Sequence, residues 1–463
     1  MPLDIPMPLS ALENLARTVG TPFQLYDEAL IRSNVQRLFA AFRQHFPSFK
    51  QHFAVKALPN PAILKMLTEE GCGLDCSSVA ELRLARVVGC DPAHVCFTSN
   101  YTSRADLKEA AEQGVTINLD DISLVDDLAE VCEGQQTPEL VSFRLNPGVG
   151  RTDSSTASNV LGGPGAKFGV AHFQIVDAYR RAQERGARRF GIHMMTGSCV
   201  LSDAYWEESL GRMFDTVATL RKELGIEFEF VNVGGGLGIP YRPGTPQVDV
   251  EALALKMRRV VDAKMEEHGM PEPCLHMENG RYVTGPMGWL VSRCHVVKET
   301  YAKYYGLDAC MANLMRPGMY GSYHHITVPA REGTEGACAA AAARVSGGAN
   351  DQKNDGRIVA NVVGTLCENN DWFAKDRSLP AGTAKGDLFV LHDTGAHSHS
   401  MGFQYNAKLR APELLQRSNG EVHIIRERET VADYFGKYVI PKDLAHGDAS
   451  GGIDVGTKIA DNE

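Results

Sequence analysis

Eight short apolar runs recur between residues 50 and 280, and amphipathic stretches separate them. Short apolar runs bounded by turn residues are typical of buried strands. The predicted strands are His52–Lys56, Gly73–Cys76, Val95–Ser99, Thr116–Leu119, Leu140–Asn146, Phe190–Met195, Phe228–Val233 and Cys274–Glu278. Eight β–α repeats predict a closed parallel barrel of the TIM type, in which chemistry gathers at the carboxyl ends of the strands. The alternative is a doubly wound open sheet, which requires a reversal of strand order that this repeat does not need.

The stretches between the first strands carry apolar residues three or four positions apart, which is the period of a helix with one buried face. Ser78 and Ser103 precede two of these stretches and are good N-caps. The helices predicted on this basis are Pro61–Glu70, Val79–Val88, Ala105–Gln113 and Ile122–Val131.

After residue 290 the helical period fades, and short β-rich runs replace it. These runs are Trp289–Cys294, Arg357–Val363, Asp387–Leu391 and Glu421–Arg426, and the early run Phe23–Tyr26 can join them. We therefore predict an α/β barrel over residues 28–290 and a mainly β domain, a barrel or sandwich, from residues 1–27 and 291–440. Biased composition predicts flexible segments at residues 331–356 and 446–463, the second within a tail that starts at 441.

The chain has 463 residues, 43% hydrophobic content and a formal charge of −10. This acidic balance argues against a nucleic acid or an anionic membrane as partner. No apolar run approaches the roughly 18 residues of a membrane span, and residues 1–6 do not resemble a secretory signal. The eleven cysteines lack zinc-site spacing. We therefore expect no metal centre and a reducing compartment, the cytoplasm or an organelle stroma.

Lys56 ends the first predicted strand, and the chain then breaks at Leu58-Pro59-Asn60. A lysine at the mouth of a buried strand is costly to desolvate. A buried amine gives up its proton more easily, and the neutral amine can form a Schiff base. The alternative is a lysine whose ammonium simply reaches solvent at the strand end.

Small-residue loops and a carboxylate follow three later strands. The sixth strand ends in Met195-Thr-Gly-Ser198, and the seventh runs into Gly234-Gly-Gly-Leu-Gly238. Amides in such loops can approach an anion closely, and barrels often bind phosphate at this place. The eighth strand ends in Glu278, which needs a cationic or hydrogen-bonding partner. A plain glycine turn and a structural Glu278–Arg281 pair are the alternatives.

The functional interpretation joins these parts. An amine, an anion cradle and a carboxylate meet the requirements of pyridoxal 5′-phosphate, whose charged pyridine ring acts as an electron sink. A carboxylate beside the ring nitrogen keeps that nitrogen protonated.

Five motifs, taken in order, resemble the signature set of the fold-type III pyridoxal-phosphate decarboxylases. They are Phe53-Ala-Val-Lys56, Gly234-Gly-Gly-Leu-Gly238, Glu278-Asn-Gly-Arg281, Cys367-Glu-Asn-Asn-Asp371 and Tyr405-Asn406, with matching order and spacing from about residue 20 to 435. The family combines a barrel with a β domain and forms homodimers with shared active sites. Within it, the chain most resembles the branch that decarboxylates meso-2,6-diaminopimelate to L-lysine and CO₂.

The resemblance implies the residues that hold the cofactor. Lys56 would be the Schiff-base lysine, and Glu278, with Gly280 and Arg281 beside it, would face the pyridine nitrogen. The phosphate would be held by Ser198, Gly235 and Gly236, with Tyr405 reaching it from the β domain.

The resemblance also implies the residues that bind a small amino-acid substrate. Arg281, with Arg316 and Tyr320, would bind its distal carboxylate, because an arginine fork offers two parallel charge-assisted bonds. Glu368 would accept the distal ammonium, Cys367 would deliver a proton, and Tyr405 would also contact the substrate. In the family, the cysteine and the glutamate come from the other subunit. The alternatives are a surface arginine at Arg316 and a small buried hydrophobe at Cys367.

Four positions depart from the family pattern. The family usually stacks a histidine of the sixth strand on the cofactor ring, but this position is Met195, with His193 two residues earlier on the same strand face. Asn279 replaces a proline, His397 replaces a tyrosine, and Leu58 replaces a smaller residue or an asparagine. The lysine, glutamate, glycines and cysteine remain, so the departures indicate a divergent branch.

Three other functions compete with this one. Decarboxylation of ornithine, arginine or a D-amino acid comes second; Arg316, and Glu368 where the ornithine enzymes carry a shorter aspartate, argue against the L-ornithine type. Amino-acid racemisation on the same barrel ranks lower, because racemases generally lack the Cys-Glu-x-x-Asp segment. A non-catalytic homologue that binds a regulator would not need Lys56.

Overall fold

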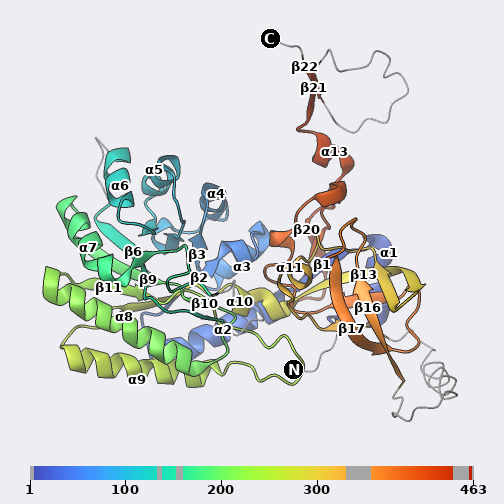
Figure 1. The fold of residues 1–463 in the computed structure, drawn as a ribbon, viewed down its shortest axis with the longest axis horizontal. Helices are drawn as coiled ribbons and strands as arrows, with labels where there is room; N and C mark the ends of the chain where they lie inside the picture. The colour runs from blue at the N-terminus through green and yellow to red at the C-terminus, as the bar shows by residue number, and fades with distance from the viewer. Residues whose placement is uncertain (1–4, 133–137, 153–159, 330–355, 442–457, 461–463) are drawn as a thin grey trace.

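The computed structural model describes residues 5–132, 138–152, 160–329, 356–441 and 458–460, and two bodies lie side by side along its long axis (Figure 1). One is a barrel wrapped by helices, and the other is rich in strands. A short arm of α13 (Val431–Phe435), β21 (Val439–Pro441) and β22 (Lys458–Ala460) extends from the second body. The segments predicted to be flexible, 331–356 and 441–463, lie almost entirely outside the described residues.

The barrel is a closed ring of parallel strands. Its strands are β2 (Lys50–Ala54), β3 (Gly73–Cys76), β4 (Val95–Phe97), β5 (Thr116–Leu119), β6 (Leu140–Asn146), β9 (Arg189–Met194), β11 (Phe228–Asn232) and β12 (Cys274–Met277). The order is β5-β4-β3-β2-β12-β11-β9-β6, and pairing of β5 with β6 closes the ring. The predicted barrel is therefore confirmed, and the open sheet is excluded.

The first strand differs from its prediction. Pairing of β2 with β3 ends where Ala54 meets Asp75, and Lys56 stands on the 3-10 turn η1 (Val55–Ala57). The apolar pattern continues past the last ladder pair because Val55 and Ala57 are buried as well. The predicted strand His52–Lys56 is thus two residues too late, although Lys56 still follows the strand end.

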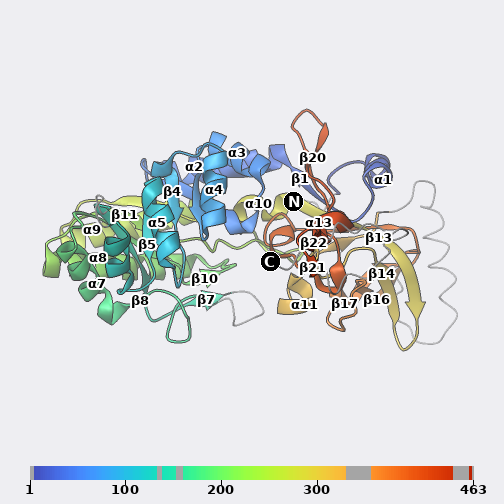
Figure 2. The ribbon, with the colours of Figure 1, turned by 90° about the horizontal axis from the view of Figure 1, so that it is seen from above.

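Helices cover the outside of the barrel (Figure 2). They are α2 (Glu28–Arg43), α3 (Pro61–Glu69), α4 (Val79–Val87), α5 (Arg104–Gln113), α6 (Leu124–Val131), α7 (Ile175–Glu184), α8 (Asp203–Leu224) and α9 (Val250–His268). The predicted caps are present, because the hydroxyls of Ser78 and Ser103 accept backbone amides at 3.3 and 3.2 Å. The helix predicted from Ile122 begins at Leu124, because the Asp121 carboxylate accepts a hydrogen bond from the Ser123 amide and holds this segment in a turn.

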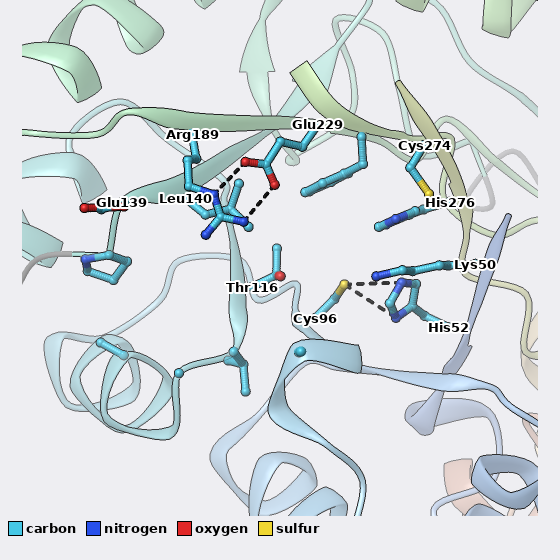
Figure 3. A pocket seen from close by; sticks show the side chains of 16 residues that line it. Lys50, His52, Cys96, Thr116, Glu139, Leu140, Arg189, Glu229, Cys274 and His276 are labelled. Atoms are coloured by element: carbon cyan, nitrogen blue, oxygen red, sulfur yellow. Dashed lines mark hydrogen bonds and ion pairs between the residues drawn. The ribbon is translucent and has the colours of Figure 1, made fainter. Parts of the chain in front are cut away.

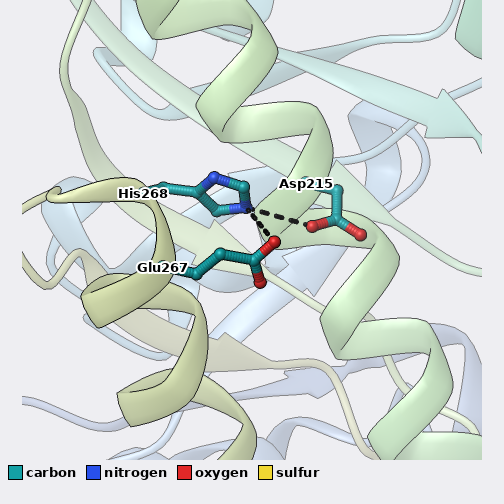
Figure 4. Close-up of side chains that lie close together, drawn as sticks. All are labelled: Asp215, Glu267 and His268. Carbon is teal, nitrogen blue, oxygen red and sulfur yellow. Dashed lines mark hydrogen bonds and ion pairs between the residues drawn. The ribbon is translucent and has the colours of Figure 1, made fainter.

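An ion-pair network joins α8 to α9 on the outer surface (Figure 4). Asp215, Glu267 and His268 approach one another closely enough to suggest a metal site. The Lys264 ammonium, however, lies 2.6 Å from the Asp215 carboxylate and 2.9 Å from that of Glu267. Lys264 thus supplies the positive charge that the two carboxylates need, and the network stabilises the helix pair.

The second body contains one large sheet. Its strands run β17 (Trp372–Pro380), β16 (Arg357–Val363), β14 (Lys303–Leu307), β13 (Gly288–Glu299), β1 (Phe23–Asp27), β19 (Glu413–Gln416) and β20 (Val422–Arg426), and β18 (Leu388–Leu391) pairs with both β13 and β15 (Ile326–Thr327). The early strand β1 is antiparallel to β13 and parallel to β19, so the chain enters the sheet before it builds the barrel.

Other elements complete the fold: α1 (Leu9–Thr18), α10 (Arg281–Thr284), α11 (Arg316–Tyr320), β7 (Arg151–Thr152), β8 (Val170–Ala171) and β10 (Gly197–Ser198). No helix in the described ranges has the length and hydropathy that crossing a membrane requires.

A buried polar contact fixes the β domain against the barrel. The Tyr26 hydroxyl donates to Glu413 at 2.7 Å, and the Asn60 amide donates to the same carboxylate at 3.2 Å. Asn60 also caps α3 by accepting the Ala62 amide at 3.0 Å. One carboxylate thus joins two strands of the sheet to the segment that follows Lys56.

Candidate active site

A cavity of about 340 Å³ opens at the carboxyl ends of the barrel strands, where the β domain meets the barrel. Residues from distant parts of the sequence converge on it. Of the residues predicted for the site, those that line it are Lys56, Met195, Ser198, Gly235, Gly236, Glu278, Gly280, Arg281, Arg316 and Tyr320.

Lys56 reaches this cavity from a turn that both domains fix. The Ala57 carbonyl accepts the His397 amide at 2.9 Å and the Ser400 hydroxyl at 3.1 Å, both from the β domain. A Cβ on Gly280 would lie 2.6 Å from the Ala57 Cβ, so glycine at this position lets the end of β12 pack on the turn. Within the described part of the chain, the Lys56 amine has neither a hydrogen bond nor an ion pair, so it is available as a nucleophile.

Glu278 is a buried carboxylate with two partners. The Nε2 atom of His193 lies 2.9 Å from one oxygen, and the Asn232 amide donates to the other at 2.7 Å. Burial alone would raise the pKa of Glu278, but His193, with smaller contributions from His52 and Lys56, lowers it to about 2. The carboxylate is therefore ionised at neutral pH and can hold a proton on a facing ring nitrogen. Sequence reasoning gave His193 no role and missed Asn232.

The glycine loop after β11 packs so closely that side chains are excluded. A Cβ on Gly235 would lie 2.3 Å from the Glu278 carbonyl oxygen, and one on Gly236 would lie 2.5 Å from that of Gly197. Gly236 also has a φ of +109°, a conformation that favours glycine. No group in the described ranges accepts a hydrogen bond from the amides of Gly235 or Gly236. Free amides in a tight loop are what an anion such as phosphate requires.

Two arginines share a buried corner of the cavity. Arg281 and Arg316 are 7% and 4% exposed, and neither forms an ion pair with a carboxylate of the described residues. Burial lowers the pKa of Arg316, and neighbouring Arg281 lowers it further, although Tyr241 acts in the opposite sense. Two like charges without a counterion make this corner a binding place for an anion.

Tyr241 stands between these arginines, and sequence reasoning missed it. Its hydroxyl accepts a hydrogen bond from Arg281, and the Arg316 guanidinium carbon lies 5.5 Å from its ring centroid. The His324 ring packs edge-on against it at 5.1 Å. Tyr241 follows the glycine run by three positions. Its position on a loop after a barrel strand is the sequence signal that could have marked it as a site residue.

Two of the four departures from the family pattern, Met195 and His397, line the cavity. Met195 lines it at the stacking position, and its carbonyl accepts a hydrogen bond from Arg144 at 3.3 Å. His397 lines it from the β domain, with a left-handed φ of 54°. Burial lowers the pKa of His397 well below its usual value, and Arg281 and Arg316 act in the same direction. The imidazole is therefore neutral.

Asp75 is a second acidic residue of the cavity that sequence reasoning missed. It is 2% exposed, and its Oδ1 atom has no hydrogen-bond partner among the described residues. Burial raises its pKa well above the usual value, and the charge on Glu278 raises it further. It occupies an inward position of β3, one strand from Lys56.

Three predicted residues do not reach the cavity of their own chain. Cys367 and Glu368 are exposed, and Tyr405 is 52% exposed on the turn Tyr405–Ala407. The predicted phosphate contact of Tyr405 is therefore not found within one chain, because this turn faces outward. The Cys367 amide donates to Asn406 at 2.7 Å, so the two segments form one surface feature.

The donor set of the cavity fits pyridoxal 5′-phosphate. The free Lys56 amine suits an aldehyde, the unpartnered amides of Gly235 and Gly236 suit a phosphate, and the ionised Glu278 suits a pyridinium nitrogen. A barrel with these groups at its carboxyl end defines a pyridoxal-phosphate enzyme.

The sequence profile described as "Pyridoxal-dependent decarboxylase, pyridoxal binding domain" matches residues 32–285. The chain belongs to this family, whose cofactor is pyridoxal 5′-phosphate. It is 41% identical to Protein TabA of Pseudomonas amygdali pv. tabaci, over 92% of this chain and 93% of TabA. It is 36% identical to a diaminopimelate decarboxylase of Methanothermobacter thermautotrophicus, over 93% of this chain and 94% of that protein.

Solved structures agree with this assignment. The diaminopimelate decarboxylase of M. jannaschii, in complex with L-lysine, superposes with a TM-score of 0.82 at 30% identity, covering 93% of this chain and 95% of that one. The barrel plus β domain, predicted as the fold class, is thus confirmed.

The low pKa of Glu278 makes a prediction about acid stability. Because the folded value of about 2 lies below the ordinary value of 4.5, ionised Glu278 stabilises the fold above pH 4.5, and this contribution is lost as the pH falls toward 2. Glu278→Gln should therefore flatten the decline of stability by up to about 1.4 kcal/mol per pH unit in this window. Thermal unfolding of both proteins from pH 5 to pH 2.5, at constant ionic strength, checks this. Parallel curves would contradict it.

Proposed function

We propose that this chain decarboxylates meso-2,6-diaminopimelate to L-lysine and CO₂. In this reaction the bond between one α-carbon and its carboxylate breaks, CO₂ leaves, and the carbon takes up a proton. The observation that supports this choice of substrate is the buried pair Arg281 and Arg316. These arginines have no carboxylate partner among the described residues, and they lie in the same cavity as Lys56. Relatives named diaminopimelate decarboxylase support the choice.

The cofactor would be held at both of its ends. Bound pyridoxal 5′-phosphate supplies an electron sink for the pair left behind by the departing CO₂. Lys56 would hold its aldehyde carbon, and Ser198, Gly235 and Gly236 its phosphate. Met195 would pack on the ring through its polarizable sulfur.

Glu278 would keep the ring nitrogen protonated. Its ionised state depends on His193 and Asn232, which also fix the direction of its two oxygens. Gly280, three residues after the end of β12, lets this segment pack closely against the Lys56 turn because it has no Cβ.

The two guanidiniums, with Tyr320, would bind the distal carboxylate. A substrate without that group leaves two buried charges unpaired, which is a large penalty. Tyr241 would keep Arg281 and Arg316 in position against their mutual repulsion. The selectivity would thus come from charges that only a diacid satisfies.

We also propose a homodimer with shared active sites. Cys367, Glu368 and Tyr405 are exposed and lie outside the cavity of their own chain, so they are available to a neighbouring one. Cys367 would deliver the proton to the substrate carbon, Glu368 would accept the distal ammonium, and Tyr405 would reach the phosphate and substrate. The bond from the Cys367 amide to Asn406 holds both segments together for this purpose.

The domain limits and the compartment belong to the same proposal. We place the barrel at residues 28–290 and the β domain at 1–27 and 291–440. The first limit falls where α2 begins, at Glu28, and the second lies within three residues of Gly288, where β13 of the sheet begins. The cysteines of the described residues are all free, which favours a reducing compartment such as the cytoplasm.

Lys56 provides the test of the cofactor link. Borohydride reduction of the holoenzyme, followed by mass spectrometry, should leave a pyridoxyl label on Lys56. Lys56→Ala should lose both the label and decarboxylation, whereas Lys65→Ala, at an exposed lysine on α3, should keep both. A label on another residue would sink the proposal.

A substrate panel tests the selectivity. CO₂ release from meso-diaminopimelate should exceed that from L-lysine, L-ornithine or D-lysine by roughly 1000-fold or more in kcat/KM. Arg316→Gln should lower kcat/KM for the diacid by about 100-fold and leave the poor substrates almost unchanged. Arg259→Gln, at an exposed arginine on α9, is the control. Equal rates for the diacid and L-lysine in the native enzyme would contradict the assignment.

Mixing two inactive variants tests the shared site. In the proposed dimer, each site takes Lys56 from one chain and Cys367 from the other. A heterodimer of Lys56→Ala with Cys367→Ala therefore has both substitutions in one site and none in the other. Random mixing should restore about a quarter of the native activity, because half of the dimers are mixed and each has one good site. If the mixture stays inactive after verified subunit exchange, Cys367 acts within its own chain and the shared site is wrong.

A further inference from the structure

The opposite end of the barrel contains a second cavity, of about 660 Å³ (Figure 3). Its lining comes from the amino-terminal ends of the strands, including Lys50 and His276, whereas Lys56 and Glu278 follow the carboxyl ends. None of its lining residues lines the active-site cavity. The amino-terminal end of a barrel usually contributes to stability rather than chemistry, so a large polar cavity here needs an explanation.

Two glycines make room for rings inside this end of the barrel. A Cβ on Gly73 would lie 2.4 Å from the His52 ring, and one on Gly191 would lie 2.0 Å from the Phe230 ring. The His276 ring stacks on Phe230 with centroids 4.6 Å apart, and its centroid lies 5.0 Å from that of His52. Aromatic and imidazole rings thus pack together inside this end of the barrel.

Most polar groups of the cavity already have partners. Glu229 accepts two bonds from Arg189, at 2.6 and 2.8 Å. The Nδ1 atom of His52 lies 3.2 Å from the His94 carbonyl oxygen, and Cys96 sulfur lies 3.6 Å from the same nitrogen. These groups are therefore satisfied without a ligand.

Two groups remain without partners. Lys50 forms no ion pair or hydrogen bond through its ammonium with any described residue, and its side chain points into the cavity beside His52 and Cys96 (Figure 3). His276 is 6% exposed, and neither of its ring nitrogens has a hydrogen-bond partner in the described part of the chain. Burial lowers the pKa of His276 well below its usual value, and His52 and Lys50 act in the same direction, so the ring is neutral and carries one N–H.

We propose that this cavity binds a small oxyanion, held by the Lys50 ammonium and the N–H of His276. A cation would be repelled by Lys50, and an apolar molecule would leave both polar groups unsatisfied. Two acidic side chains line the cavity, and both act on Arg189: Glu229 accepts two bonds from it, and the charge on Glu139 also raises its pKa. Neither forms an ion pair with Lys50 in the described part of the chain, so neither supplies the missing counterion. A phosphate or a small carboxylate provides both the charge and the acceptor oxygens that the site lacks.

The test uses the holoenzyme, because the bound cofactor fills the phosphate position of the active site. Inorganic phosphate is titrated by calorimetry at constant ionic strength, maintained with chloride, and succinate is titrated in a second arm. Because the Arg281–Arg316 corner of the active site can also take an anion, the titration is repeated with Arg316→Gln. Saturable binding of one anion per chain that this variant retains, with a rise of the melting temperature that follows occupancy, is expected for at least one of the two. Binding of phosphate alone or of succinate alone identifies the source of the oxyanion. Failure of both to bind overturns the proposal.

Variants then locate the anion. Lys50→Met keeps the length of the side chain and removes its charge, so the dissociation constant should rise at least about tenfold. His276→Gln, a second variant at the same site, tests the contribution of the imidazole and should also weaken binding. Lys65→Met, at the exposed lysine on α3, should bind as the native enzyme does. Native affinity in Lys50→Met would place the anion elsewhere and overturn the proposal.

Decarboxylation without added anion separates this proposal from the catalytic one. Lys50→Met should leave turnover unchanged, because Lys50 lies at the end of β2 remote from Lys56. Loss of anion binding with full turnover supports a second site. Loss of turnover in Lys50→Met together with unaltered anion binding would contradict the second site.

Discussion

The active site depends on one buried carboxylate that stays charged. Burial removes Glu278 from solvent, so without favourable interactions its carboxylate would be protonated at neutral pH. His193 and Asn232, which point inward from the two preceding barrel strands, supply those interactions at 2.9 and 2.7 Å. Because the three side chains come from β9, β11 and the end of β12, a correctly closed barrel is a condition for the charge. The chemistry of the cofactor ring thus rests on the register of parallel strands.

The cavity contains two charged regions, one on the barrel side and one at the domain boundary. On the barrel side, a lysine, a carboxylate and free amides fit the cofactor; at the domain boundary, Arg281 and Arg316 with Tyr241 fit a distal anion. The β domain contributes Arg316 and Tyr320, and Glu413 fixes that domain to the segment after Lys56. In the proposed reaction, substrate selection would therefore depend on domain placement, whereas cofactor binding would depend mainly on the barrel.

Much of this could be predicted from the sequence, because strands and strand-end motifs leave local signals. The barrel strands were found to within two residues, and ten predicted site residues line one cavity. Asn232, Tyr241 and Asp75 were missed, since a polar residue inside a strand or loop carries no sign of which face it occupies or what lies opposite. The role of Tyr405 stays a prediction: its turn faces outward in the single chain, and a short motif does not reveal which way its turn faces. His397, which does line the cavity, was noticed only as a departure.

The contact between Gly235 and the Glu278 carbonyl oxygen has a consequence for the size of the ligand. A Cβ at position 235 would come within 2.3 Å of that oxygen, so the loop after β11 rests directly on the strand end that bears the carboxylate. The spacing between the free amides and the Glu278 side chain is therefore set by backbone touching backbone. With the phosphate on these amides and the ring nitrogen at Glu278, as proposed above, this contact would fix the length of the cofactor that the site accepts.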